Sequence, residues 1–400
     1  MELNACEVGG KTLKFKACGE SILIPGCILY SRGGTIPHLT AENMSTVSCE
    51  NNLWHVPLET VFEQPGLDVM EKYGKSFHEF ISEKKKTLLL NTSDTYLGRP
   101  EIYSYNEEKS VSIWAPGGRR KVTPDDYMKY LETFGFDVCI PPSDTVPECS
   151  SKKRTRKSFD RTIRFLDRCL QIKKEKNLNV PVLGVIEGGD SKFEREKCAK
   201  EVFSRNVDGY VISGFDRIPS KYKEMLQLCM NELKDNKVKI MFGILTPVEV
   251  VTAVELGVDV FDSVISYYAS ERGCALNFVY TQDKLRHRME KSTSAETTSC
   301  ESNEESLAKD RKNIDSFEMN LNDKIYFDDT RSLVEGCQCY CCQRYVRAYV
   351  HHLLVTKEML AQVLLMMHNL HHWLDFFKEI RESVKKGKLA ELKDILLNNS

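Results

Sequence analysis

Six short apolar runs alternate with helical patterns through the middle of the chain. The runs are Thr87–Leu90, Phe136–Ile140, Val180–Ile186, Gly209–Ile212, Lys239–Ile244 and Val258–Ile265. Runs of this length that are rich in Val, Ile, Leu and Phe are typical of buried strands. A strand, a helix and another strand in succession place the strands parallel in one sheet. The pattern therefore predicts an α/β fold.

The helical segments between these runs carry their own signals. Thr123 can cap a helix that has Pro124 in its first position and two acids in its first turn. Further apolar stripes cover Asp160–Lys174, Pro219–Lys234 and Thr246–Leu256. Six strands, with room for more in residues 1–85, favour a TIM-type (β/α)8 barrel. A doubly wound sheet remains the alternative, because periodicity alone does not exclude it.

The charge balance limits how the chain can bind nucleic acid. Its 400 residues carry a formal charge of −2, so binding by bulk positive charge is excluded. One local basic run stands out, formed by Lys152, Lys153, Arg154, Arg156 and Lys157. Such a run is usually the solvated start of a helix. The alternative is that these five side chains contact RNA phosphates.

Two features indicate a cytoplasmic location. The longest apolar stretch, Met359–Met367, covers about nine residues and is interrupted by Gln362, whereas a bilayer helix needs about 20. The N-terminus has no secretory signal pattern. Fifteen cysteines without such a signal indicate reduced thiols rather than a disulfide framework.

A polar segment divides the chain. Between Glu290 and Lys312 the apolar side chains are only Ala295, Cys300, Leu307 and Ala308. Such a composition does not bury enough surface to offset the entropy of ordering. We therefore expect barrel residues over 1–280, a mobile insertion over 281–322 and a structured C-terminal element over 323–400.

Four cysteines crowd into six residues near the start of this element. Cys337, Cys339 and Cys342 offer three thiolates, and a fourth ligand would close a tetrahedral Zn²⁺ site. Such a closed site would be structural. The pattern leaves the fourth ligand open among the histidines that follow, namely His351, His352, His368, His371 and His372. A coincidental cluster or a redox-reactive patch is the alternative.

The segment from Cys337 to Leu353 resembles the zinc segment of tRNA-guanine transglycosylases. It reads Cys-x-Cys-x-x-Cys, then Arg-Ala-Tyr and His-His-Leu. In that family the zinc histidine follows the third cysteine by 26 residues, and this count reaches His368 here. The run Gly257–Asp262 is similar to a family strand, and Gly184–Gly189 stands where the family has a Gly-rich turn.

The resemblance implies an irregular (β/α)8 barrel with a C-terminal zinc-binding element and one structural Zn²⁺ per chain. Family members exchange guanine at tRNA position 34 for a modified base. An aspartate forms a covalent bond to the ribose, and a second aspartate acts as general acid and base. By resemblance, Asp262 stands at the position of the nucleophile.

Several departures from the family pattern put catalysis in doubt. The motif that supplies the second aspartate is absent, and Asp94 is out of register with it. Glu187 replaces the base-recognition glutamine, and Ser143 replaces a base-reading aspartate, with Asp144 next to it. Since one carboxylate cannot run the exchange alone, Asp262 is interpreted as vestigial, and no catalytic residue is predicted.

This pattern resembles the accessory, non-catalytic members of the family. The resemblance implies a heterodimer with a catalytic queuine tRNA-ribosyltransferase subunit, a shared tRNA substrate with a GUN anticodon, no DNA partner, and peripheral attachment to the mitochondrial outer membrane. Two alternatives stay open: an active homodimer that uses Asp262 as nucleophile, and a zinc-stabilised RNA-binding module. A zinc hydrolase is disfavoured because the Cys₃His set is closed.

Overall fold

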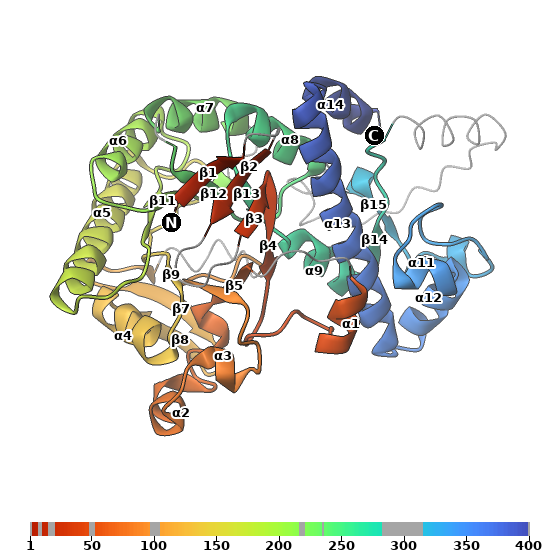
Figure 1. The fold of residues 1–400 in the computed structure, drawn as a ribbon, viewed down its shortest axis with the longest axis horizontal. Helices are drawn as coiled ribbons and strands as arrows, with labels where there is room; N and C mark the ends of the chain where they lie inside the picture. The colour runs from red at the N-terminus through yellow and green to blue at the C-terminus, as the bar shows by residue number, and fades with distance from the viewer. Residues whose placement is uncertain are drawn as a thin grey trace. The chain divides into compact units, whose positions relative to one another are not determined.

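The computed structural model describes residues 2–6, 10–14, 21–47, 53–96, 105–215, 221–233, 236–281 and 315–398 (Figure 1). The chain divides into two compact units. We call the first the barrel unit; it comprises Met1–Pro37, Glu50–Ile244 and Leu256–Val264. The second, the C-terminal unit, comprises His38–Cys49, Leu245–Glu255 and Ile265–Ser400.

Eight parallel strands form the sheet of the barrel unit. In sheet order they are β10 (Leu183–Ile186), β11 (Gly209–Ile212), β12 (Val238–Met241), β13 (Val260–Asp262), β4 (Gly26–Tyr30), β5 (Leu53–Pro57), β6 (Thr87–Asn91) and β9 (Val138–Cys139). A parallel bridge between Cys139 and Val182 brings the two ends of this order together. The sheet is therefore a nearly closed barrel, which confirms the predicted fold class over a doubly wound sheet.

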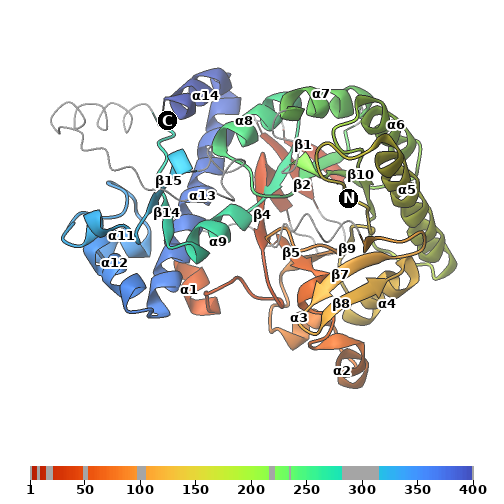
Figure 2. The same ribbon diagram turned by 180° about the vertical axis from the view of Figure 1, so that it is seen from behind.

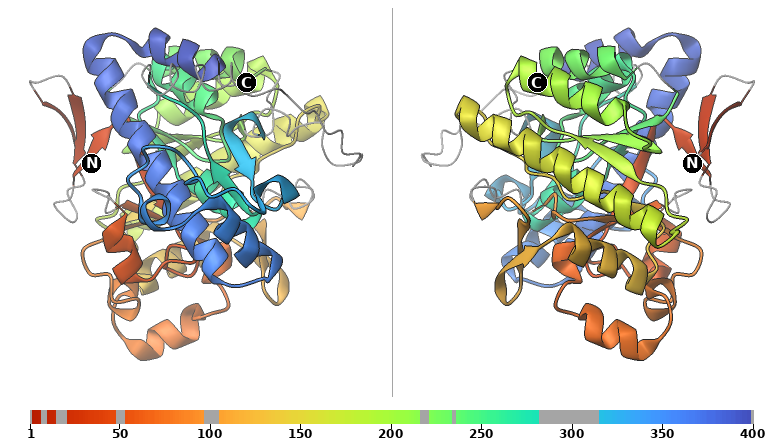
Figure 3. Two further views of the ribbon diagram at one scale, coloured as in Figure 1. Left: turned by 90° about the vertical axis from the view of Figure 1, so that its right-hand side faces the viewer. Right: turned by 90° about the vertical axis from the view of Figure 1, so that its left-hand side faces the viewer.

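All six predicted strands are present, and the two further strands, β4 and β5, lie in the N-terminal region that had room for them. Alternate strand residues fill the interior, among them Ile28, Leu89, Val185, Val211 and Ile240. A small antiparallel sheet of β1 (Glu2–Cys6), β2 (Gly10–Lys14) and β3 (Ser21–Ile24) precedes the barrel (Figure 3). Ile22 and Ile24 of β3 belong to the same core.

Four helices follow one another around the outside of these strands (Figures 1 and 2). They are α4 (Pro124–Phe134), α5 (Lys152–Glu175), α6 (Lys192–Phe203) and α7 (Tyr222–Glu232). Thr123 and Asp126 form a capping box at the start of α4, as predicted. Helix α5 begins at Lys152 rather than at Asp160, because Ser151 caps it, so the basic run forms its first two turns.

Shorter elements complete the barrel unit. They are η1 (Leu58–Thr60), α2 (Gly66–Tyr73), α3 (Phe77–Phe80) and the hairpin of β7 (Val111–Ala115) and β8 (Gly118–Val122). Tyr127 of α4 donates to the carbonyl oxygen of Leu90 at 2.7 Å, which ties this helix to the end of β6.

The C-terminal unit is mainly helical. Its elements are α1 (Ala41–Thr46), α8 (Pro247–Leu256), α9 (Val264–Glu271), β14 (Cys274–Leu276), η5 (Asp315–Phe317), β15 (Glu318–Asn320), η6 (Lys324–Tyr326), α11 (Tyr340–Arg344), α12 (Arg347–Val355), α13 (Leu360–Lys386) and α14 (Leu389–Leu397). The end residues Leu256 and Val264 group with the barrel unit. The central turns of helix α13, Leu364–Leu374, are buried on every side, with Leu364, Leu370 and Trp373 in the core.

The predicted insertion over 281–322 differs from the structure at its C-terminal end. Residues 282–314 lie outside the described residues. Residues Glu318–Asn320, however, form β15 and pair antiparallel with β14. Phe317, Met319 and Leu321 are buried there. None of the helices that the structure describes is both long and apolar enough to cross a membrane.

Candidate metal centre and barrel mouth

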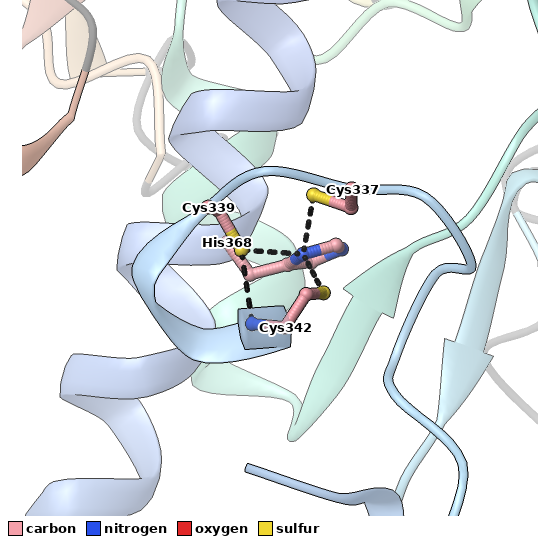
Figure 4. Close-up of side chains that lie close together, drawn as sticks. All are labelled: Cys337, Cys339, Cys342 and His368. Atoms are coloured by element: carbon pink, nitrogen blue, oxygen red, sulfur yellow. Dashed lines mark hydrogen bonds between the residues drawn. The ribbon is translucent and has the colours of Figure 1, made fainter. Parts of the chain in front are cut away.

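Three thiols and one imidazole converge in the C-terminal unit (Figure 4). Nδ1 of His368 lies 3.9 Å from Sγ of Cys337, 3.4 Å from Sγ of Cys339 and 3.3 Å from Sγ of Cys342. All four ligand atoms lie within 4.8 Å of one another, and all four residues are buried. This is the group that the cysteine spacing and the family resemblance predict.

The local fold explains why the cysteines point inward. Cys339 caps α11, and its Sγ accepts a hydrogen bond from the backbone N–H of Cys342 at 3.3 Å. Gln343 donates to the carbonyl oxygen of Cys337 at 2.7 Å, which closes the loop on itself. His368 lies within α13, which packs against α11. The centre therefore joins a short loop to the longest helix of the chain.

One backbone contact fixes which nitrogen of His368 faces the thiols. Nε2 of His368 lies 2.9 Å from the carbonyl oxygen of Leu276, so Nε2 carries the proton and donates to it. Nδ1 is then unprotonated and available as a metal ligand. Two of the other histidines contact backbone carbonyls as well: Nδ1 of His351 lies 2.8 Å from that of Leu321, and Nε2 of His372 lies 3.0 Å from that of Phe278.

The donor set fits a zinc ion. A tetrahedron with Zn–S bonds of about 2.3 Å and a Zn–N bond of about 2.0 Å separates sulfur from nitrogen by roughly 3.5 Å. The observed separations of 3.3 to 3.9 Å bracket this value. Cys341 is buried outside the group, and burial raises the pKa of its thiol. Three thiolates and one imidazole fill four positions, so a bound Zn²⁺ would have no open site for a substrate.

Asp262 lies at the carboxyl end of β13 in the barrel unit. It is buried, and its Oδ2 accepts a hydrogen bond from Oγ1 of Thr95 at 3.1 Å. The next residue, Ser263, accepts from the backbone N–H of Tyr30 at 2.9 Å. The carboxyl ends of parallel barrel strands are where active sites of this fold occur. Asp262 therefore stands where a nucleophile would stand.

Asp94 is a second carboxylate near this end of the barrel, and its backbone N–H donates to Oε2 of buried Glu59 at 3.0 Å. Its Oδ1 accepts hydrogen bonds from the hydroxyl of Tyr30 at 2.6 Å and from the backbone N–H of Tyr96 at 2.9 Å. Nε of Arg32 lies 3.7 Å from its Oδ2. Asp94 is thus buried and held in place by these contacts. Asn91, at the end of β6, lines a small cavity together with Asp94.

The cavity at the mouth is small. Its volume is about 50 Å³, and its lining includes Asn91, Asp94, Ser143 and Ser213. This is room for a few water molecules. A second cavity, of about 540 Å³, shares Asp94 and is lined also by Arg32 and Glu59, and its volume falls within the range of about 300–1,000 Å³ that ligand pockets usually span. Just behind the small cavity, Glu187 is fully buried and accepts from Oγ1 of Thr145 at 2.6 Å. Burial raises the pKa of Glu187.

Asp144 forms ion pairs with two arginines. Nη1 and Nη2 of Arg154 donate to its two oxygens at 2.8 and 2.6 Å, and Nη1 of Arg161 donates to Oδ2 at 3.0 Å. The bidentate pair gives Arg154 a structural role that the basic run did not reveal. The other four cations, Lys152, Lys153, Arg156 and Lys157, are exposed.

Comparison with known proteins agrees with this arrangement. A family model described as queuine tRNA-ribosyltransferase matches residues 8–400. The chain belongs to this family. A human protein named queuine tRNA-ribosyltransferase accessory subunit 2 is 36% identical over 417 residues, with 98% of this chain and 97% of the relative covered. Relatives with the same name occur in Danio rerio, at 36% identity over 99% of this chain and 97% of the relative, and in Ixodes scapularis, at 32% over 94% and 93%.

Membership of the family fits both the barrel and the Cys₃His centre. The predicted resemblance to tRNA-guanine transglycosylases is therefore confirmed. The resemblance to their accessory members is confirmed too, because the relatives reported above are named accessory subunits. The residues that sequence reasoning did not single out are partners of the carboxylates: Thr95 beside Asp262, Tyr30 beside Asp94, and Arg161 beside Asp144. Arg154 was singled out as a possible RNA contact, but its pairing with Asp144 was not predicted. Nothing in the sequence pattern pairs them.

Proposed function

We propose that this chain is the accessory, non-catalytic subunit of a heterodimeric queuine tRNA-ribosyltransferase. In this proposal a separate catalytic subunit exchanges guanine for queuine at the wobble position of tRNA with a GUN anticodon. The names of the relatives support the accessory role. The expected cytoplasmic location rests on the missing signal pattern, the fifteen cysteines and the family resemblance, and the attachment to the mitochondrial outer membrane rests on the family resemblance alone.

The state of the carboxylates is the observation that carries the proposal. Base exchange needs one carboxylate to attack the ribose and another to move a proton. By resemblance Asp262 stands at the first position, whereas Asp94, the carboxylate that lines the cavity of about 50 Å³, accepts hydrogen bonds from Tyr30 and Tyr96. In this proposal Asp94 therefore has a structural role and does not act as the general acid and base.

The metal centre has a structural part in this proposal. Cys337, Cys339, Cys342 and His368 would hold one Zn²⁺, which would supply a rigid link and no reactive ligand position. The thiolates and Nδ1 fasten the loop before α11 to α13. The carbonyl oxygen of Leu276 orients the imidazole, since it accepts the proton of Nε2.

An exposed apolar patch in the C-terminal unit suits a partner subunit. Phe327 is 76% exposed, and its ring centroid lies 6.5 Å from that of His351 on α12. Val355 follows His351 by one turn of α12, and Met359, 85% exposed, begins the next helix. Ile325 of η6 is exposed beside Phe327. We call these four apolar side chains the α12 patch and propose it as part of the heterodimer contact.

A mixing experiment tests the proposed function. The full chain, the catalytic subunit and their mixture are each assayed for incorporation of labelled guanine into tRNA, and the mass of the mixture is measured in solution. The proposal predicts a one-to-one complex, exchange by the mixture and none by this chain alone. Exchange by the purified single chain would instead support an active homodimer. Capture of tRNA without a second protein would support an RNA-binding module.

A further inference from the structure

The first turns of α5 and α6 present exposed cations beside an exposed aromatic ring. Lys152 and Arg156 are exposed on α5. Phe193, on the first turn of α6, has 71% of its surface exposed. A phenylalanine so exposed contributes little to the fold, so its surroundings indicate what it could contact.

Two contacts show which face of α5 lies toward α6. The ring of Phe159 on α5 has Nζ of Lys197 on α6 at 4.3 Å from its centroid. Two turns later, Oδ1 of Asp167 pairs with Nε of Arg205, just beyond the end of α6, at 2.6 Å. Residues three, four and seven apart share a helix face. Lys152 and Arg156 precede Phe159 by seven and three residues, so they lie on this same face.

Phe193 lies at the same level on the neighbouring helix. It precedes Lys197 by four residues, which places it one turn nearer the start of α6 on the same face. Both helices follow parallel strands, β9 and β10, and so run in the same direction (Figure 1). One turn back from the contact between Phe159 and Lys197, Phe193 on α6 is therefore level with Arg156 on α5.

The positive charges at the start of α5 do not stabilise the helix. A helix N-terminus favours acids, and each cation there costs a few tenths of a kcal/mol up to about 1 kcal/mol. Helix α5 has no acid in its first turn, and Asp160 is the only acid among its first twelve residues. Arg154 forms an ion pair with Asp144, which offsets this cost. Neither Lys152 nor Arg156 forms an ion pair among the described residues. Their charges suit an external anion.

We propose that Lys152, Arg156, Phe193 and Lys197, which we call the α5–α6 strip, bind an unpaired segment of RNA. The cations contact phosphates, and Phe193 stacks on one base. An unpaired segment is required because the bases of a duplex do not expose their faces. That this RNA is tRNA rests on the proposed function.

Binding of an unmodified tRNA transcript with a GUN anticodon tests the strip. Affinity is measured by fluorescence anisotropy at several salt concentrations, for the full chain alone and for the heterodimer. Phe193→Ala is expected to weaken binding by roughly 5- to 150-fold, and Phe193→Trp to keep it within about threefold. The double variant Lys152→Gln and Arg156→Gln should lower the slope of log affinity against log salt by about 1.4.

Matched controls lie at the far ends of the same helices. Phe203, also exposed, ends α6, and Lys174 is exposed near the end of α5. Phe203→Ala and Lys174→Gln should leave affinity unchanged within about twofold. Melting curves confirm that each variant is folded.

Three results would overturn the strip. The first is an affinity of Phe193→Ala for the transcript within twofold of that of the unmodified chain. The second is a loss of affinity in Phe203→Ala equal to that in Phe193→Ala. The third is binding of the chain to phosphatidylserine vesicles without any binding to the transcript. The mixing assay separates the two proposals. Normal exchange together with an unaffected Phe193→Ala variant rejects the strip alone. If Phe193→Ala weakens tRNA binding but no mixture exchanges guanine, the accessory role alone is rejected.

Discussion

Nε2 of His368 lies 2.9 Å from the carbonyl oxygen of Leu276, while Nδ1 of the same ring faces the three thiols. Strand β14, which ends at Leu276, therefore sets the tautomer of the fourth ligand from outside the cysteine loop. The sequence spacing relates His368 to Cys342, but it gives no hint of Leu276. The metal centre thus depends on three separate stretches of the C-terminal unit.

The first prediction concerns metal content. His368→Ala should lose stoichiometric zinc and lower the melting temperature, because structural zinc sites carry an apparent binding free energy of about 10 kcal/mol or more. His352→Ala is the control, since His352 is exposed on α12. Elemental analysis and thermal melting measure both effects. Equal zinc in the two variants would contradict the assignment.

The second prediction concerns the buried ion pair at the start of α5. Asp144 has a fully buried carboxylate between Arg154 and Arg161. Asp144→Ala should lower the free energy of unfolding by about 3–5 kcal/mol, because it removes the buried carboxylate from Arg154 and Arg161 and leaves Arg161 only its contact with Glu108 among the described residues. Arg156→Ala, at an exposed position nearby, should change it by no more than about 0.5 kcal/mol. Denaturant unfolding measures the difference, and equal effects would argue against this role for Asp144.

Sequence reasoning reached the fold because strand runs and helix starts are local signals. The six apolar runs all became strands, and the capping box at Thr123 formed as predicted. The apolar stripe of α5 begins only at Asp160, but the basic run before it forms the start of this helix, which is the usual interpretation of such a run. The order at Glu318–Asn320 was missed because it depends on pairing with β14, far away in sequence.

The site was predictable only in part. Cysteine spacing and family resemblance together located the four residues that converge at the candidate metal centre, since both are patterns along the chain. The fates of Asp94 and Arg154 depend on Tyr30 and Asp144, and such pairs form only when separate strands and loops meet in space. Phe193 gave no signal either, because an apolar residue on a helix is expected to be buried.

The third prediction is a pH dependence from Glu187. Burial raises its pKa above the ordinary value of 4.5. Between 4.5 and the raised pKa, the folded chain holds a proton that the unfolded chain has released, so the free energy of unfolding falls as pH rises through this window. Glu187→Gln has no proton to hold. Its stability relative to the unmodified chain should therefore increase from about pH 4.5 upward and then level off. A difference that stays constant with pH would contradict this.

The fourth prediction concerns the α12 patch. Phe327→Glu should weaken association with the catalytic subunit by tenfold or more, about 1.4 kcal/mol, because it places a charge in an apolar contact. The melting temperature of the isolated chain should hardly change, since Phe327 is exposed. Leu397→Glu, at another exposed apolar position in the same unit, is the control. Analytical ultracentrifugation measures association, and equal affinity of the two variants would count against the patch.

The remaining measurement addresses the absence of catalysis directly. Asp262→Asn keeps the shape of the side chain and removes the carboxylate at the carboxyl end of β13, which by family resemblance would be the nucleophile. We predict that a complex of this variant with the catalytic subunit exchanges guanine at a rate within about twofold of the unmodified complex. A fall of several orders of magnitude, as removal of a nucleophile causes, would show that Asp262 performs the chemistry and would contradict the accessory role.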